Sequence, residues 1–421
     1  MPPLNWTEPC SIARTATTAG LAKGWVSQPN QRGTLDILSG CIITILLCSW
    51  SVLCLHIPEP EAGHWSFLRY KLRWQFFTII FPEVIVSMAA EQWESANQNV
   101  TKFTQLGYPQ WTMRHAFFAD MGGFMLSSPD FPDFPIDGCQ LAYLVEQKYI
   151  RLPEVDVRTI WDRNKADGFA RLITSVQIAW FCIKCIARWI QRLTLSTLEL
   201  TTFAFIIATL NTLFFWNHKP LDVTTPIVLQ TETRITDILI KAGDVAREPY
   251  LRTPLDFLTS PPTSWKSYNR PIRRFGNTKT RPPAGLTYRE SIYGILFEFV
   301  YFGIHLIGWR SVFPTMLERY LWRISSLVLL GLLCLYLFCI PLGVATARPF
   351  SKAILGKELS TPLEVAENLP KWAQRVIHIP IVGFYVLARL YILLEGLVSL
   401  RALPLDAYTD ISWSNFLPHL R

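Results

Sequence analysis

Seven stretches of this chain are long and apolar enough to cross a lipid bilayer, and they limit the fold more than any other feature. About 20 mostly apolar residues cross the hydrocarbon core as an α-helix. Such stretches occupy residues 33–56, 74–90, 170–190, 196–216, 291–313, 321–346 and 376–400. No single soluble core would use seven helices of this length. The pattern therefore predicts an all-α membrane protein, a bundle of about seven transmembrane helices with long structured segments between them.

Composition supports this fold class. Half of the 421 residues are hydrophobic and only 17% are charged, whereas a soluble protein of this size carries about 25% charged residues. The net charge of +8 does not indicate nucleic acid as a partner, because the Lys and Arg residues fall largely between the apolar stretches. Composition thus excludes a soluble enzyme, a disordered chain and a nucleic-acid-binding module, and it names the lipid bilayer as the first partner.

The spans divide the chain into nine segments. These are an N-terminal extramembrane segment (1–32), transmembrane helices 1–2 (33–90), an extramembrane helical insert (91–169), transmembrane helices 3–4 (170–216), a Pro-rich basic loop (217–290), transmembrane helices 5–6 (291–346), a loop (347–375), transmembrane helix 7 (376–400) and a C-terminal tail (401–421). The insert is too long to lack structure of its own, and residues 137–150 and 154–169 have the pattern of amphipathic helices.

Two further segments carry local signals. Pro129, Pro132 and Pro135 recur every three residues, a spacing that predicts a short polyproline II segment. Residues 260–290 are rich in Lys, Arg, Pro and Gly, and we expect a loop draped over the surface.

Seven spans place the two termini on opposite sides of the membrane. Lys and Arg have similar densities on both sides, so they do not set the orientation. Two N-x-S/T acceptors, Asn5 and Asn99, fall on the side of the long loops and are glycosylation candidates. They favour a lumenal or extracellular N-terminus, in the endoplasmic reticulum or the plasma membrane.

Ionisable side chains within the spans are the first candidates for chemistry. A charge at the centre of a bilayer costs about 2.5 kcal/mol or more, so it persists where it is paired, neutralised or exposed to a cavity. Glu298, Tyr301 and His305 are three and seven residues apart, which places them on one helical face.

The last span carries a second stripe, formed by His378, Tyr385 and Arg389. Arg389 lies too deep to reach the headgroups, so we expect a carboxylate partner, either Glu298 or Glu83. Glu83 follows Pro82, where a proline frees a backbone carbonyl and permits a kink. These residues form either a proton-handling site, in which burial keeps an acid neutral, or a structural ion pair between helices.

The segment GYPQWTMRHAFFADMGGF at residues 107–124 is the strongest local string. His115 and Asp120 there could act as a base and its orienting acid, or the segment could be a packed aromatic loop at the membrane surface. Asp130, Asp133 and Asp137 have a metal-site rhythm that the surrounding prolines explain better. No phosphate loop, nucleophile elbow or zinc motif occurs, so we expect no cofactor and no metal.

The strings WTMRHAFFADMGGF, IWDRNKADGFARLIT, LSTLELTTFAF, FFWNHKPLDV and FPTMLERYLWRISSL carry a wider resemblance. From about residue 31 to about residue 345 the chain resembles a large, uncharacterised family of polytopic membrane proteins of filamentous fungi. No established catalytic residues come with that family. The resemblance implies by analogy a place in secondary-metabolite biosynthesis, as an accessory enzyme or cyclase-like factor.

Three functions remain open at the level of the sequence. The first is a membrane enzyme that performs acid–base chemistry on a lipophilic small molecule alongside other pathway enzymes. Its candidate catalytic residues are Glu83, Glu298, His305, Arg389, His115 and Asp120. The second is a transporter or seven-helix receptor, and the third is a non-catalytic membrane scaffold.

Overall fold

The computed structural model describes residues 20–27, 32–59, 63–153, 155, 167–221, 223, 225–243, 253–258, 272–277, 288–356, 365 and 368–413. The fold is mostly helical, as predicted. The longer helices are α1 (Thr34–Ser51), α2 (His64–Ile80), α3 (Pro82–Gln105), α7 (Asp167–Ile190), α8 (Thr197–Phe215), α10 (Tyr288–Ile307), α11 (Met316–Leu355) and α13 (Lys371–Val398). The shorter ones are α4 (Met113–Asp120), α5 (Gly138–Glu146) and α9 (Ile235–Ala242).

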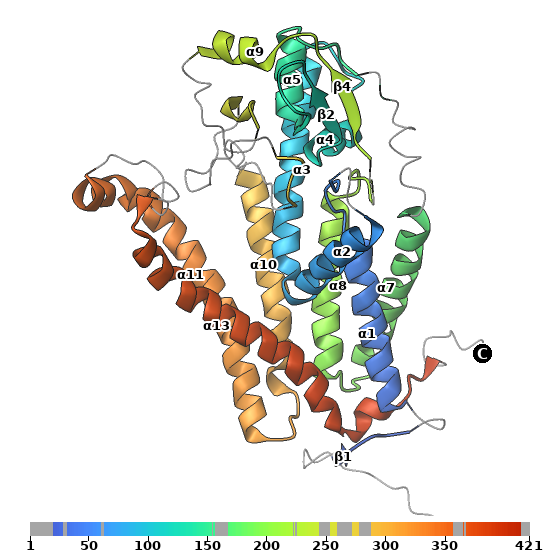
Figure 1. Cartoon of the computed structure of the whole chain (residues 1–421). Coiled ribbons are helices and arrows are strands. Elements are labelled where there is room, and N and C mark those ends of the chain that lie inside the picture. The colour runs from blue at the N-terminus through green and yellow to red at the C-terminus, as the bar shows by residue number, and fades with distance from the viewer. Residues whose placement is uncertain are drawn as a thin grey trace, which may run out of the picture.

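Helix α8 is the centre of the bundle, and α1, α3, α7, α10 and α13 pack against it (Figure 1). The apolar window of α8 is 67% buried, compared with 22% for that of α11 and 17% for that of α13. Helices α11 and α13 pair along their length and extend away from the bundle at one end (Figure 1). We call this pair the arm.

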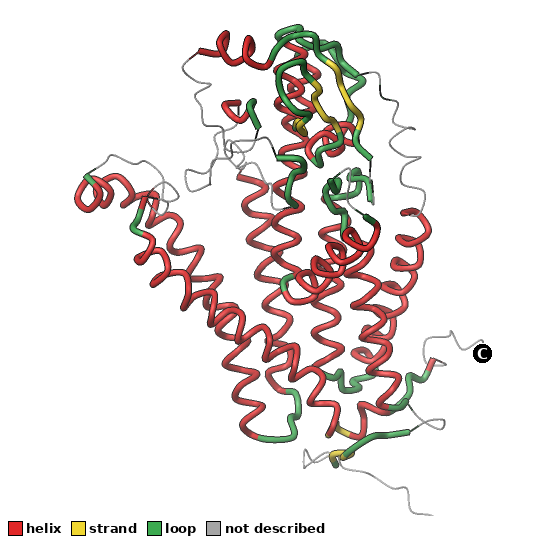
Figure 2. Tube along the Cα trace, in the orientation of Figure 1, coloured by secondary structure: helices red, strands yellow, loops and turns green. Residues whose placement is uncertain are grey.

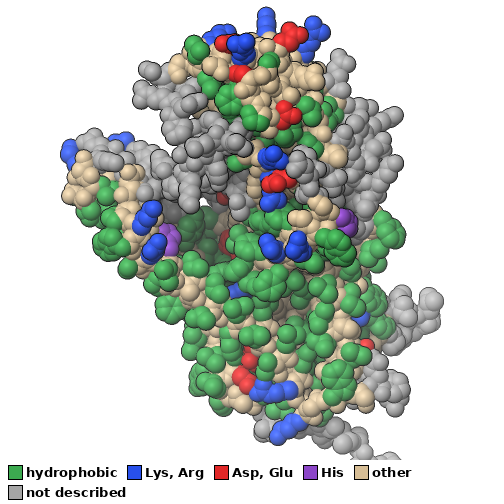
Figure 3. Space-filling model, viewed as in Figure 1, with side chains coloured by type: hydrophobic (Ala, Val, Ile, Leu, Met, Phe, Trp, Pro, Cys, Tyr) green, Lys and Arg blue, Asp and Glu red, His purple; other side chains and the backbone are tan. Residues whose placement is uncertain are grey.

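The outward faces of the bundle are strongly apolar. Large exposed side chains cover the arm, including Phe338, Trp372 and Phe384. Figure 3 shows a band of hydrophobic side chains across the lower half of the molecule, with Lys and Arg above and below it. Soluble proteins rarely expose apolar patches of this size, so the surface fits a membrane environment.

The prediction of seven spans is confirmed only in part. Within the described residues, five helical segments are long and apolar enough to cross a membrane, or six if α2 and α3 count as one broken span. The predicted span at 74–90 is wrong as a single helix, because it covers the junction where α2 and α3 meet at 109°. Helix α10 coincides with most of the predicted span at 291–313.

The cap is a small α/β domain at the upper end of α3, built from α4, α5, α9, β2 (Phe124–Ser127), β3 (Phe134–Ile136) and β4 (Ile227–Gln230). Its sheet has the order β3-β2-β4, antiparallel on one side of β2 and parallel on the other. Pro135 lies opposite Met125 in this sheet, so the predicted polyproline segment is a strand at residues 134–136. The predicted helix at 137–150 is present as α5, whereas most of 154–169 lies outside the described residues.

The lower end of the molecule joins two distant parts of the chain. Strands β1 (Leu21–Lys23) and β5 (Ala402–Pro404) pair antiparallel, away from the cap sheet (Figure 2). Residues 21 and 404 therefore lie at the same end of the bundle. If the chain spans a membrane, the expectation of termini on opposite sides is wrong, because an even number of crossings is then required.

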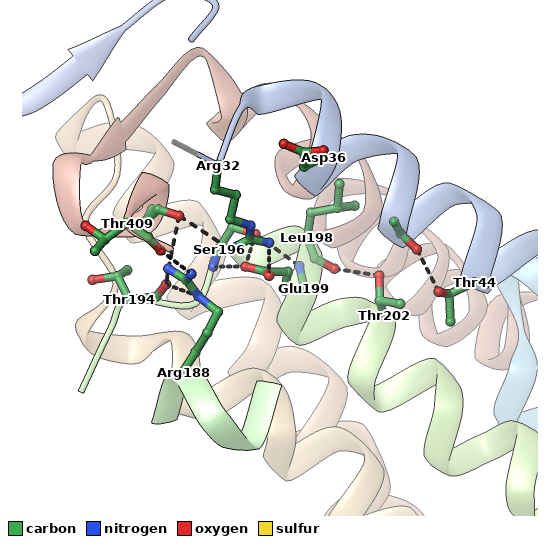
Figure 4. A network of polar contacts seen from close by, with 12 residues as sticks. Arg32, Asp36, Thr44, Arg188, Thr194, Ser196, Leu198, Glu199, Thr202 and Thr409 are labelled. Atoms are coloured by element: carbon green, nitrogen blue, oxygen red, sulfur yellow. Dashed lines mark hydrogen bonds and ion pairs between the residues drawn. The ribbon is translucent and has the colours of Figure 1, made fainter. Parts of the chain in front are cut away.

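A buried polar network holds this lower end together (Figure 4). Arg188 is 1% exposed, and its guanidinium donates to the carbonyl oxygens of Thr194 and Thr409 at 2.9–3.3 Å. Glu199 caps α8 through the backbone N–H of Ser196 and forms an ion pair with Arg32. The Glu199 side chain is buried in this network, at 3% exposure.

Besides β4 and α9, the predicted basic loop (217–290) contains a short strap at residues 272–277. Phe275 and Asn277 are 2% and 5% exposed, and Asn277 Oδ1 accepts a hydrogen bond from the His56 backbone N–H at 2.6 Å. This short part of the segment 260–290 is therefore packed into the fold rather than draped over it.

Candidate functional site

The candidate site is built on the helix break at Phe81–Pro82. Proline lacks the N–H needed to continue α2, but its fixed φ suits the first turn of a new helix. Helix α3 accordingly begins at Pro82. The last carbonyls of α2 and the first N–H groups of α3 consequently meet inside the protein.

Arg389 of α13 complements the α2 side of the break. Its Nε donates a hydrogen bond of 2.9 Å to the carbonyl oxygen of Ile80, and the side chain is 1% exposed. A cation is favourable at the carboxyl end of a helix. The guanidinium carbon also lies 5.4 Å from the centre of the Tyr301 ring, within the range of a cation–π contact.

Glu83 complements the α3 side. It is the second residue of α3, where a carboxylate is favoured by the helix dipole, and it is 4% exposed. Arg389 and the Tyr301 hydroxyl both interact with it electrostatically. Of the two acids predicted as partners of Arg389, Glu83 is therefore the one that it faces.

Helix α10 supplies the third wall. Tyr301 and His305 are fully buried on one face, with ring centres 5.9 Å apart, and Phe297 stacks on Tyr301 at 5.8 Å. The indole N–H of Trp322 donates to the His305 carbonyl oxygen at 3.2 Å and fixes α10 against α11. The face predicted from residue spacing is thus present and points into the bundle.

The polar atoms of the cluster are largely without hydrogen bonds. Several buried atoms form no hydrogen bond of regular geometry with other protein atoms. They are both carboxylate oxygens of Glu83, both ring nitrogens of His305, the hydroxyls of Tyr301 and Tyr385, and Nη1 of Arg389, although the Tyr301 hydroxyl and Glu83 still interact weakly. A buried polar group left without any partner costs about 1–3 kcal/mol. Such groups are satisfied by ordered water, by a ligand or by a reaction that uses them.

Glu298 links the cluster to the outside. It keeps part of its surface exposed and interacts electrostatically with Glu83. Glu298 is therefore a half-buried acid beside the fully buried residues of the cluster.

The stripe predicted on the last span is only partly in the site. Tyr385 stacks on Phe81 at 5.8 Å and lies beside the break with Arg389. His378 is exposed, and its Nδ1 lies 2.8 Å from the Gln374 carbonyl oxygen, so it is not part of the cluster.

The predicted pairing of His115 with Asp120 is wrong. Nδ1 of His115 accepts from the Thr112 backbone N–H at 3.1 Å, and Nε2 donates to the Val155 carbonyl oxygen at 2.8 Å. The ring also stacks on Trp111 at 5.0 Å. His115 is therefore a core residue of the cap, which agrees with the alternative of a packed aromatic loop.

Asp120 instead belongs to a second polar pocket, between the cap and the bundle. Its polar lining residues are His56, Gln92, Ser95, Asp120, Asp137 and Lys219. Lys219 was not predicted, because a Lys four residues beyond an apolar run is indistinguishable in sequence from one that reaches the headgroups. Only the fold brings it under the cap.

Other sequence candidates have structural roles. Asp130 accepts hydrogen bonds from the backbone N–H groups of Ile235 and Thr236 at the start of α9, and Asp137 caps α5. Hydrogen bonds thus explain the acidic rhythm, and no group of His, Cys, Asp or Glu among the described residues is arranged to hold a metal.

The glycosylation prediction has a different outcome at each sequon. Asn99 is 6% exposed, and its Oδ1 accepts a 2.8 Å hydrogen bond from the Trp111 indole. A glycan on this side chain is incompatible with the fold, so the prediction at Asn99 is wrong. Asn5 lies outside the described residues.

Comparison with known proteins identifies a family. Residues 10–242 and 293–420 match a family described as a family of unknown function (DUF8562). The chain belongs to this family. The matched ranges include Glu83, Tyr301, His305 and Arg389, and they leave out residues 243–292 of the basic loop. No curated protein and no solved structure matches the chain. Membership in an uncharacterised family agrees with the sequence analysis, and it assigns no activity.

Proposed function

We propose that this protein is a multi-pass membrane protein that binds a lipophilic small molecule beside the helix break and catalyses an acid–base reaction on it. The observation that carries the proposal is the set of buried acid, base and hydroxyl groups without hydrogen bonds around Glu83. The apolar outer faces of the arm support a lipid environment, from which a lipophilic substrate can be drawn.

The chemistry follows from the positions of the side chains. Glu83 is the proton donor or acceptor, and Arg389 fixes its orientation and stabilises negative charge that develops beside it. Tyr301 interacts with both of these residues and can pass a proton to or from the substrate. His305 lies next on the same face and extends the relay, while the half-buried Glu298 can exchange protons with the surroundings.

Substrate and setting are also proposals. A lipophilic intermediate of fungal secondary metabolism, handled together with other pathway enzymes in the endoplasmic reticulum or plasma membrane, is the setting that the sequence resemblance implies. The aromatic rings of Phe297, Tyr301 and Phe81 around the acid suit an apolar substrate that develops positive charge.

The test compares lipid-soluble metabolites of cells in which the gene is deleted or is replaced by a variant. Glu83→Gln removes the titrating group and keeps the shape. Glu94→Gln is the matched control, because Glu94 is also a buried acid on α3 but bonds to Gln98 instead. We expect a compound that depends on the wild-type protein to persist in Glu94→Gln and to disappear in Glu83→Gln, at equal protein levels in the membrane. Normal amounts of the compound in Glu83→Gln would refute the proposal.

One observation favours a second candidate, a transporter. Helices broken within the bundle and helix ends that point at a polar site are typical of secondary transporters, and α2 and α3 form such a pair. The same metabolite comparison separates the two functions. An enzyme changes the chemical identity of a compound, whereas a transporter changes only its distribution between cells and medium.

A further inference from the structure

Lys219 is a buried amine that the site at the helix break does not use. It follows the end of α8, beyond the apolar window, and it is 2% exposed. Its Nζ donates a 2.7 Å hydrogen bond to Gln92 Oε1 and lies 4.1 Å from the centre of the Trp216 ring. Buried lysines are usually paired with a carboxylate. Among the described residues, the hydrogen-bond partner of Lys219 Nζ is a neutral amide instead.

Gln92 is itself held in one orientation. Its Nε2 donates to the backbone carbonyl oxygen of Asn277 in the strap at 3.1 Å, which leaves Oε1 to face the amine. One N–H of the Lys219 amine therefore donates its hydrogen bond to Gln92. In the neutral amine, the nitrogen lone pair is then directed away from Gln92.

The surroundings favour the neutral amine. Burial lowers the pKa of Lys219 to about 7, although Cys54 and Asp120 act in the opposite direction. Asp120 is occupied by the Ser95 hydroxyl and the Gly138 backbone N–H, both at 3.0 Å. Asp137, the other acid of the pocket, caps α5.

Lys219 lines a small pocket between the cap and the bundle. The cavity measures about 20 Å³ and is partly open to solvent. His56 and Asp120 line the same pocket. A small molecule inside it would meet an amine, an imidazole and a carboxylate.

We propose that Lys219 is a nucleophile that binds a small aldehyde or ketone in this pocket as a Schiff base. The Nζ lone pair attacks the carbonyl carbon, the C–N bond forms as the C=O π bond opens, and one proton passes from nitrogen to oxygen to give a carbinolamine. The C–O bond then breaks as the nitrogen forms the C=N bond, and the second nitrogen proton leaves with the hydroxyl as water, so that one amine and one carbonyl give one imine and one water. His56 and Asp120 are the groups placed to move these protons. The site is separate from the one at the helix break and does not depend on the proposed function.

The test is reductive trapping on the full-length protein in lipid nanodiscs. Propanal and cyanoborohydride are added at pH 7, and mass spectrometry measures alkylation at each lysine. A pKa of about 7 leaves roughly a thousandfold more free amine at Lys219 than at an ordinary lysine. After allowing for restricted access, we expect Lys219 to react at least about tenfold faster than the partly exposed Lys102 and the exposed Lys241. A rate at Lys219 equal to or below theirs would overturn the proposal.

Two controls make the result specific. In protein unfolded in urea, Lys219 should be alkylated no faster than Lys102 and Lys241. Faster alkylation of Lys219 in urea would contradict a role for the pocket. Gln92→Glu keeps the size of the side chain but places a carboxylate against the amine, which favours the ammonium form. In this variant we expect Lys219 to be alkylated more slowly at pH 7 than in the wild-type protein, while Lys102 is alkylated at an unchanged rate. An unchanged alkylation rate of Lys219 in the variant would argue against the proposal.

Discussion

At the scale of single residues, the site at the helix break has both an electrostatic explanation and a cost. Arg389 and Glu83 each complement the end of a helix, one at the last carbonyls of α2 and the other at the first turn of α3. A simple structural pair would satisfy its own hydrogen bonds. These two residues do not, since Nη1 of Arg389 and both oxygens of Glu83 form no hydrogen bond of regular geometry.

Removal of Arg389 should therefore destabilise the protein through the acid left behind. We expect Arg389→Gln to lower the free energy of unfolding by about 3–5 kcal/mol, and the double variant with Glu83→Gln to recover part of that loss. Thermal unfolding in detergent measures both, with Arg375→Gln as the control because Arg375 is exposed on the same helix. Equal stability of Arg389→Gln and Arg375→Gln would contradict the coupling.

Lys219 should make stability depend on pH in the alkaline range. Its pKa is lowered to about 7 by burial, so between pH 7 and pH 10 the unfolded chain binds a proton that the folded protein does not. Stability should then rise with pH across this window, by at most about 1.4 kcal/mol per pH unit, and the full penalty remains below pH 7. Chemical unfolding of wild-type protein and of Lys219→Met should differ in this slope. Identical slopes would show that Lys219 keeps its ordinary pKa.

At the scale of elements, the lower end depends on one guanidinium. Arg188 of α7 bonds to the turn before α8 and to the backbone of residues 406–409 in the C-terminal segment. Strand β5 is only three residues long and pairs with an equally short β1. The pairing of these strands thus relies on side-chain anchoring more than on the sheet.

Replacement of Arg188 should release the C-terminal segment locally. We expect Arg188→Met to speed hydrogen exchange at residues 402–409 by about tenfold or more, because several buried carbonyls lose their donor. The cap should exchange as before. Hydrogen exchange read by mass spectrometry provides the measurement, and the exposed Arg192→Met is the control. Unchanged protection of residues 402–409 in Arg188→Met would mean that the strand pairing alone holds them.

The sequence predicts helices far better than it predicts angles between them. Hydropathy over 74–90 averages across Pro82 and gives one apolar stretch, although proline at this point starts a new helix at 109° to the old one. Spacing along α10 correctly placed Tyr301 and His305 on one face, because that face follows from helix geometry alone. The choice of Glu83 for Arg389 required the packing of α13 against the break, which no local pattern contains.

At the scale of the whole molecule, one span more or fewer decides whether the two termini lie on the same side of a membrane or on opposite sides. The antiparallel pairing of residues 21–23 with 402–404 brings both ends of the described chain together. The part of the cap within residues 91–169 was predicted as a structured insert, but its sheet was not, and β4 and α9 lie in a segment predicted as a loop. Strands β2 and β4 are about a hundred residues apart in the chain and pair in parallel, a contact that no local signal predicts.

Both termini should lie on one side of the membrane. Short epitope tags placed before residue 20 and after residue 413 should become accessible together when intact vesicles are opened, and not one before the other. Protease protection of the two tags gives the measurement. Opposite protection of the tags would contradict the β1–β5 pairing in the membrane.

A high-resolution structure of the protein purified in lipid nanodiscs would show directly whether the helix break is a ligand site. We expect a non-protein molecule with its polar end within hydrogen-bond distance of Glu83, Tyr301 or His305, and its absence from the Glu83→Gln variant. Direct hydrogen bonds among Glu83, Tyr301 and Arg389 that leave none of their polar atoms unpaired would contradict it, and would make the break a structural joint.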